Sequence, residues 1–361
     1  MITLCFNIIM NGQEMSKKFN KGEWSEFYVF IKILSDKKIF LLDDKLNKLE
    51  SFYEVIKILR KEVSSASYII NDNKIIKKID DKIIEIEVEK IKPFIPILFD
   101  SLKNESGASF LIKKVDDIFK IIDSNEIKIG SSYDKSDITL VMKDDKLLNK
   151  ELGFNIKSQM GNAPTLLNSS MATNFVYEVE GYNGNIEEVN NIETKSKIRD
   201  RILYLIQKKA SIKFKEMDNS TFNKNLRLVD TLLPEILSIS LLNFYSGKGR
   251  KINEVSELLS SSFLSLSHEE FTFKVKSFLL SIALGMVPTK TWDGFYSADG
   301  YIVVKNNGEI GCFSVLDKKI LADYLYNKTK FDTPSSSRHD YGYIYKNDGK
   351  LYIKLNLQIR F

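Results

Sequence analysis

Two neighbouring segments carry side chains of the types that phosphodiester hydrolysis needs. Asp137 opens the run Asp137–Met142, and Asn155 and Lys157 lie in the next run, Leu152–Ser158. Side chains in a strand repeat every second residue, so Asn155 and Lys157 share a face. If the two strands pair, a carboxylate, an amide oxygen and an ammonium group meet at one rim. Oxygen ligands suit Mg²⁺, and a cation near the attacking water stabilises hydroxide. These three residues alone would also fit a solvated strand edge.

The flanking sequence predicts the elements that position this pair. A polar turn around Asp144 and Asp145 joins the two strands, and Pro164–Val176 is typical of a loop leading into a helix. An alternating run predicts a strand over Ile83–Val88. Apolar residues at helical spacing predict helices over Gly22–Leu34, Leu46–Leu59, Lys195–Lys209, Leu232–Tyr245 and Glu269–Leu284.

The texture of the sequence changes after Gly285, where glycines, aromatics and short alternating runs become frequent. We therefore expect three regions: residues 1–15 as a dispensable extension, 16–287 as the helical and nuclease core, and 288–361 as a β-rich region for DNA recognition. The strands expected in the last region are Tyr301–Lys305, Gly311–Val315, Tyr341–Tyr345 and Leu351–Phe361.

Composition narrows the classes of site. The 53 basic and 48 acidic residues leave a net charge of +5, which suits a nucleic-acid partner without requiring one. Cys5 and Cys312, with His268 and His339, are too few for a disulfide framework or a Cys/His zinc site. No Gly-x-Ser-x-Gly turn is present, which argues against an esterase-type triad. Any metal would be a hard cation on oxygen ligands.

Three blocks of polar-rich segments follow one another along nearly the whole chain after Ser16. They are Lys21–Glu26 with Leu46–Ser51; Asp137–Thr139, Gly153–Gln159, Thr165–Asn168 and Ala172–Phe175; and Trp292–Gly294, Thr333–His339 and Leu355–Phe361. In this order they resemble the HpaII restriction endonuclease family of the PD-(D/E)XK nuclease superfamily. The resemblance implies an α/β nuclease core, a central mixed sheet flanked by helices.

Carried over residue by residue, the resemblance implies a metal-ligand role for Asp137 and a catalytic role for Lys157. The acidic position two residues before the lysine is Asn155 here, which brings an oxygen but no charge. A second carboxylate is then expected from elsewhere in the chain, and many nucleases of the superfamily supply one from the first helix. Glu26 is the first choice, Glu23 the second and Glu151 the third. The alternative for the helix acids is a first turn that simply favours negative charge.

Candidate DNA contacts fall into two groups. Phosphates would attract the basic helix, with Lys195, Lys197, Arg199, Arg201, Lys208 and Lys209, unless it is a solvated face. Bases would be read by residues near the strand of Lys157 and in the C-terminal block: Asn162, Asn168, Arg338, His339, Gln358 and Arg360. The structural alternative for Arg338 and Arg360 is pairing with Asp332, Asp340 or the backbone.

The resemblance implies a type II restriction endonuclease that uses Mg²⁺ to cut double-stranded DNA at a short palindrome, with CCGG as the family target, leaving 5′-phosphate and 3′-hydroxyl ends. A palindrome calls for two symmetric readers, so we expect a homodimer, with a monomer cutting each strand in turn as the alternative. A companion DNA methyltransferase is implied, because an unprotected host genome would be cut. Residues 1–10 are too short to span a bilayer, and we expect a cytoplasmic protein. Two alternatives stay open: a structure-specific repair or recombination nuclease, and a catalytically inactive DNA-binding module.

Overall fold

A computed structural model describes residues 18–61, 65–124, 136–143, 149–255 and 266–361. The chain divides into two compact units, each drawn from separated stretches. The first unit comprises Met1–Ile39, Phe52–Gly161 and Val303–Ile310, and the second comprises Phe40–Ser51, Asn162–Ile302 and Gly311–Phe361. The expected extension over residues 1–15 and the turn around Asp144 and Asp145 lie outside the described residues, and the expected boundary near residue 288 stays a prediction.

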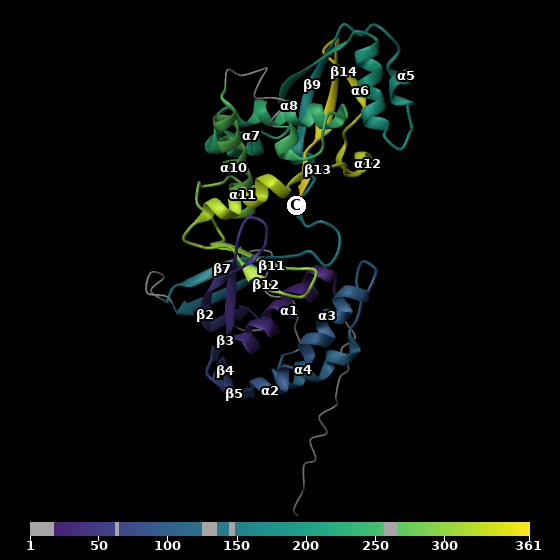
Figure 1. Ribbon diagram of the computed structural model, residues 1–361. Coiled ribbons are helices and arrows are strands. Elements are labelled where there is room, and N and C mark those ends of the chain that lie inside the picture. Colours follow the sequence, from purple (N-terminus) through teal and green to yellow (C-terminus); the bar gives the residue numbers. More distant parts are fainter. Residues whose placement is uncertain (1–17, 62–64, 125–135, 144–148, 256–265) are drawn as a thin grey trace, which may run out of the picture. The chain divides into compact units, whose positions relative to one another are not determined.

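A large mixed sheet flanked by helices is the main feature of the fold, which confirms the expected α/β class (Figure 1). Nine strands follow in the order β1-β12-β11-β7-β6-β2-β3-β4-β5, with β1 and β12 parallel. Their bounds are β1 Lys38–Leu42, β2 Lys48–Lys61, β3 Ser65–Ile70, β4 Lys74–Ile79, β5 Lys82–Glu87, β6 Ile138–Lys143, β7 Glu151–Ser158, β11 Gly300–Val304 and β12 Ile310–Cys312. The expected strands β5, β6 and β7 are therefore confirmed.

Helix α1 (Lys21–Asp36) confirms the helix expected over Gly22–Leu34. Asn20 begins it, because its side chain accepts a hydrogen bond from the backbone of Glu23 while the Glu23 side chain bonds back to Asn20. Its apolar face is fully buried and packs on β7 and on α3, elements distant in sequence (Figure 1). The other helices of this unit are α2 Val88–Ile91, α3 Phe94–Asn104, η1 Lys113–Val115 and α4 Asp116–Ile121.

The helix expected over Leu46–Leu59 was wrong, because this segment forms strand β2. Its buried residues are Tyr53 and Val55, then Ile58 and Arg60. A β-bulge between Val55 and Lys57 shifts the register against β6. Leu49, Phe52, Ile56 and Leu59, which suggested the helix, lie outside this buried set. Apolar residues therefore occur on both faces of the strand, and their combined spacing resembles helical periodicity.

The second unit contains two smaller sheets. One has the order β10-β9-β15-β14 and the other β13-β16-β8. Their bounds are β8 Thr165–Leu167, β9 Asn174–Glu180, β10 Ser211–Met217, β13 Lys330–Asp332, β14 Ile344–Asn347, β15 Lys350–Asn356 and β16 Gln358–Arg360. The helix expected at the end of Pro164–Val176 was wrong. A 3₁₀ turn, η2 (Met171–Thr173), leads instead into β9, which is paired on both sides.

The helices of the second unit confirm three expected segments, now placed at α6, α8 and α10. Helix α11 was not expected, since it interrupts the region predicted to be β-rich. The bounds are α5 Ile186–Asn190, α6 Lys197–Gln207, α7 Ser220–Val229, α8 Leu233–Tyr245, α10 His268–Ala283, α11 Lys318–Lys328 and α12 Ser336–His339.

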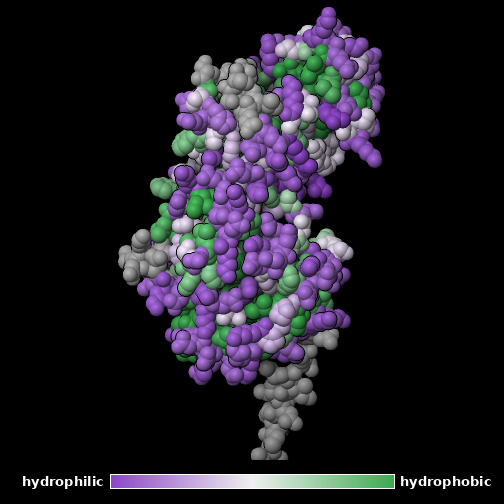
Figure 2. Space-filling model, in the orientation of Figure 1, coloured by the Kyte–Doolittle hydropathy of each residue, from purple (hydrophilic) through white to green (hydrophobic). Residues whose placement is uncertain are grey.

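Hydrophilic residues cover most of the face shown in Figure 2, with hydrophobic residues in scattered patches. Within the described part of the chain, no single helix has both the length and the apolar character to cross a membrane. Among the described helices, α7 and α8 reach that length and apolar character only when taken together, and they are bent by 109° relative to each other.

Candidate nuclease site and DNA-binding residues

Strands β6 and β7 pair antiparallel, which confirms the arrangement that the sequence required for a shared site. Ile138 lies opposite Phe154, and the backbone N–H of Asp137 donates to the Phe154 carbonyl at 2.9 Å. The Asp137 carboxylate in turn accepts a hydrogen bond from the Ile156 N–H at 2.6 Å. Phe154 and Ile156 are buried, whereas Lys157, on the other face of β7, is half-exposed. Asp137 is thus fixed at the start of β6 by the backbone of β7.

Burial gives the Asp137 carboxyl an unusual environment. Loss of solvent raises its pKa above the ordinary value, and the Ile156 N–H and the charge of Lys157 partly oppose this rise. The positive charge of Lys157 thus favours the ionised form of Asp137. Among the described residues Lys157 forms no hydrogen bond or ion pair, so its charge is available to a ligand.

Asn155 lies one position beyond the Ile138–Phe154 pair, so the antiparallel register puts it opposite Asp137. Glu151 shares its face of β7 but is four residues away, which corresponds to about 13 Å along a strand. The Glu151 carboxylate is exposed and lies 3.7 Å from Lys57 Nζ. Glu151 therefore belongs to the opposite end of the strand.

The two acidic residues of α1 differ in what they do. Glu23 is engaged in the helix cap, since its Oε2 accepts from the Asn20 N–H at 2.9 Å. Glu26, three residues further along and half-buried, is not part of this cap. A Cβ added at Gly161, just after β7, would lie 3.2 Å from Lys21 Cδ. The beginning of α1 therefore adjoins the end of β7 that carries Lys157, which favours Glu26 over Glu151.

The oxygen-bearing groups fit a divalent cation only in part. Among residues that the structure describes, no three His, Cys, Asp or Glu side chains are grouped so that they could hold a metal ion. Asp137 nevertheless has the character of a ligand, because a bound cation would offset the burial that raises its pKa. Asn155 offers a neutral oxygen beside it. Of the proposed metal ligands, the Asp137 carboxylate is held in place by the Ile156 N–H, and the acidic position of the D/E-x-K motif is occupied by the neutral Asn155.

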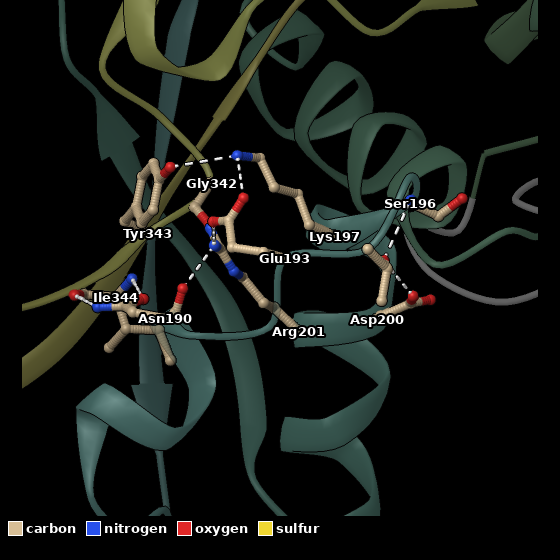
Figure 3. Close-up of polar contacts among 10 residues, drawn as sticks. Asn190, Glu193, Ser196, Lys197, Asp200, Arg201, Gly342, Tyr343 and Ile344 are labelled. Atoms are coloured by element: carbon tan, nitrogen blue, oxygen red, sulfur yellow. Dashed lines mark hydrogen bonds and ion pairs between the residues drawn. The ribbon is translucent and has the colours of Figure 1, made fainter.

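Arg201 is buried, contrary to its expected role as a phosphate contact (Figure 3). Its guanidinium donates to the carbonyls of Gly342 and Asn190, each at 2.6 Å, and to Glu193 Oε1 at 2.7 Å. The ring of Tyr343 lies 4.2 Å from the guanidinium carbon. With no exposed surface, Arg201 joins α6 to the segment before β14 rather than to a ligand.

The other two basic residues proposed on α6 keep some exposure. Lys197 Nζ lies 2.9 Å from Glu193 and 3.3 Å from the hydroxyl of Tyr343, and both hydrogen bonds raise the pKa of Lys197 (Figure 3). Arg199 is about half-exposed and has a loose contact of 3.5 Å with Asp200. Arg199 is therefore better placed than Lys197 to receive a phosphate.

The candidate base-reading residues divide in the same way. Arg338 is exposed and forms no hydrogen bond or ion pair within the described part of the chain. Arg360 Nε pairs with Asp332 at 2.6 Å, and its NH1 donates to the Ala163 carbonyl at 3.1 Å. Arg360 thus has the contacts of the structural alternative. Gln358 in β16 is buried.

His339 is held beside Arg338. Its Nε2 lies 3.0 Å from Ser169 Oγ, and its carbonyl accepts from the buried Asn174 side chain at 2.9 Å. Burial and the nearby charge of Arg338 lower the pKa of His339. Asn162 and Asn168 are exposed in the segment after β7.

One basic loop escaped the sequence analysis. Gly247-Lys248-Gly249-Arg250 follows α8 and lines a cavity together with the beginning of α6. The alternation of glycine with basic residues is the signal that could have identified it.

Comparison with known proteins now assigns the family. The HpaII restriction endonuclease family model matches residues 20–361. The type II restriction enzyme HpaII of Haemophilus parainfluenzae is 40% identical over 353 residues, which cover 95% of this chain and 98% of that enzyme. No solved structure matches the chain. The chain therefore belongs to the HpaII restriction endonuclease family and is a type II site-specific deoxyribonuclease.

Proposed function

We propose that this enzyme uses Mg²⁺ to cut double-stranded DNA at the palindrome CCGG. The observation that carries the chemical part is the pairing of β6 with β7, which puts Asp137 opposite Asn155 and within the electrostatic influence of Lys157. Restriction enzymes of this type generally need a divalent metal ion. CCGG is the target that the family resemblance implies.

The proposed division of labour follows from charge and position. The oxygens of Asp137, Asn155 and Glu26 would hold the metal ion, and Lys157 would orient the attacking water and stabilise the hydroxide that forms. A bound Mg²⁺ supplies positive charge that lowers the pKa of water and neutralises the phosphate. In-line attack on phosphorus breaks its bond to the 3′-oxygen, which leaves 5′-phosphate and 3′-hydroxyl ends.

Recognition is assigned to the second unit. Arg338 is the leading guanine contact, because an exposed guanidinium can donate two hydrogen bonds to one base edge. His339, Asn162 and Asn168 are proposed as further readers. Gln358 and Arg360 are proposed to support them from β16.

The biological setting is part of the same proposal. A palindromic target favours a homodimer, in which each chain meets one half-site. A companion DNA methyltransferase would protect host DNA, and the enzyme would act in the cytoplasm on incoming DNA.

Digestion of a sequenced plasmid tests the proposal. With Mg²⁺ we expect discrete fragments whose ends all map to CCGG and carry 5′-phosphate. Parallel binding measurements in Ca²⁺ separate binding from cutting. Binding without any cleavage in Mg²⁺ would indicate a catalytically inactive DNA-binding module, the alternative raised by the neutral side chain of Asn155. Ends that follow DNA structure rather than sequence would indicate a repair nuclease.

A further inference from the structure

A polar cavity of about 900 Å³ lies within the second unit, and none of its lining residues is among those proposed for catalysis. Three segments line it: the beginning of α6, the loop Gly247–Arg250 after α8, and Thr333–Ser337. Its volume is in the range of ordinary ligand-binding clefts. These segments come from distant parts of the sequence, so the cavity exists only in the folded unit.

The lining is strongly basic. It includes four cationic side chains, Lys195, Lys197, Arg199 and Arg250, and one carboxylate, Asp332. The Asp332 carboxylate is already neutralised, because its Oδ1 lies 3.2 Å from Arg250 NH2 and its Oδ2 pairs with Arg360 of β16. Lys195 is exposed and forms no ion pair among the residues with described positions. The cavity therefore presents a surplus of positive charge to a ligand.

Backbone and hydroxyl donors add to this charge. Ser196 makes no side-chain cap at the beginning of α6, where the Lys197 N–H donates to the Thr194 carbonyl at 3.2 Å and the next N–H groups of the first turn have no partner within the helix. Ser335 and Ser337 also line the cavity, and their hydroxyl oxygens lie 3.3 Å apart. Gly247 has a φ of 80°, and a Cβ there would lie 3.2 Å from Arg199 Cδ. Glycine thus lets the Arg199 side chain pass close to the loop.

The walls of the cavity are held in place before any ligand binds. Arg201, one turn after Lys197 in α6, donates to the carbonyl of Gly342, which follows Ser337 by a few residues (Figure 3). Arg250 Nε donates to the Phe331 carbonyl at 3.0 Å, which fixes the loop to the segment before Thr333. Such preorganisation lowers the cost of ordering side chains when an anion binds.

We propose that this cavity binds the phosphodiester backbone of double-stranded DNA, with Arg199 and Lys195 contacting the phosphate oxygens. The inference rests on the proposed function and deepens it by naming the DNA group bound and the residues that bind it. It predicts contacts that are blind to sequence, because phosphates are the same at every base pair.

The test measures binding of a scrambled duplex in Ca²⁺ at salt concentrations from 50 to 200 mM, for the native enzyme and for Arg199→Ala and Lys195→Ala. Each variant should lower the slope of log affinity against log salt by about one. When the salt concentration falls fourfold, from 200 to 50 mM, the affinity of each variant should therefore rise by a factor about three times smaller than the factor for the native enzyme. Arg199→Lys, which keeps the charge, should recover most of the slope.

Arg227→Ala and Lys224→Ala are the matched controls, since both residues are exposed on α7 in the same unit and neither lines the cavity. They should leave the slope unchanged. Slopes of the cavity variants that equal the native slope, or that fall no more than those of the α7 controls, would overturn the inference. The measurement involves neither cleavage nor a chosen target, so a native enzyme that fails to cut at CCGG would count against the proposed function alone.

Discussion

Side-chain environment separates the charged residues of this enzyme into two kinds. Lys157 and Arg338 form no hydrogen bond or ion pair with a described residue, and they lie where a ligand can reach them. Arg201 and Arg360 are bonded to carboxylates and backbone carbonyls. Substitution of the first kind should change activity, whereas substitution of the second kind should change stability.

Asp137→Ala and Lys157→Ala should each lower DNA cleavage by more than about a hundredfold and leave binding in Ca²⁺ largely intact. The reason is that one residue holds the proposed metal ion and the other the proposed hydroxide. Single-turnover cleavage of plasmid DNA is the measurement. Lys143→Ala is the control, since Lys143 is exposed at the other end of β6. A cleavage rate near native in either variant would remove that residue from the site.

Glu26→Gln should lower cleavage far more than Asn155→Ala, because Mg²⁺ prefers carboxylate oxygen and Asn155 offers only a dipole. Glu23→Gln should act on the helix cap and lower stability by under about 1 kcal/mol. Cleavage rates and urea midpoints of all three variants distinguish these effects. Equal losses at Glu26 and Asn155 would move the missing carboxylate elsewhere, with Glu23 and Glu151 next to examine.

Arg338→Ala should weaken binding to the target duplex by about 1–3 kcal/mol while binding to a scrambled duplex changes little. Arg360→Ala should instead lower stability, since it breaks the pair with Asp332. Titration of both duplexes in Ca²⁺ is the measurement. A folded Arg338→Ala enzyme with full preference for the target would remove Arg338 from the reading set.

The same variant offers a check on placement. Arg338 lowers the pKa of His339 through its charge, so its removal should raise that pKa. The chain has only two histidines, which makes an NMR titration simple to assign. An unchanged pKa of His339 in Arg338→Ala would contradict the arrangement described.

At the scale of elements, the position of α6 is fixed by the hydrogen bonds of Arg201. Its basic residues suggested a solvated, DNA-facing helix, yet Arg201 points inward and connects α6 to Gly342 and to the end of α5 (Figure 3). The exposed charges at its beginning are thereby given a fixed position beside the loop after α8.

Arg201→Ala should destabilise the enzyme by about 2–4 kcal/mol, because a buried and a part-buried carbonyl lose their donor and a large side chain leaves the interior. Glu193 is mostly exposed, so the loss should stay below that of a fully buried charge pair. Urea unfolding measures it, with Arg227→Ala as the exposed-arginine control. A loss as small as that of the control would show that the Arg201 network contributes little.

At the scale of the whole molecule, the residues proposed for cleavage and those proposed for DNA binding belong to different units. The residues proposed for cleavage all belong to the first unit, and those proposed for DNA reading and phosphate binding all belong to the second. Each unit is assembled from several stretches of sequence, so neither corresponds to one continuous segment.

We expect two protein chains on each palindromic duplex, because each chain would read one half-site. Sedimentation of the enzyme with a single-site duplex in Ca²⁺ measures this stoichiometry, and a scrambled duplex of equal length is the control. One chain per duplex at saturation would support a monomer that cuts the strands in turn.

The sequence by itself determined the features that depend on local pattern. The amphipathic α1 and the alternation along β7 follow from the order of neighbouring residues, so they were predicted correctly. The pairing of β6 with β7, on which the proposed site of Asp137, Asn155 and Lys157 depends, was also expected, because strands that are consecutive in sequence tend to pair.

Only the tertiary structure decided the features that depend on distant partners. Pairing with β3 and β6 decided that β2 is a strand, because apolar residues on both of its faces give its sequence a helix-like spacing. Arg201 and Arg360 look like surface arginines until folding brings Gly342 and Asp332 to them. The basic cavity likewise joins three remote segments. Periodicity reports which face of an element is apolar, but the partner of a charged group is chosen by contacts between elements far apart in the chain.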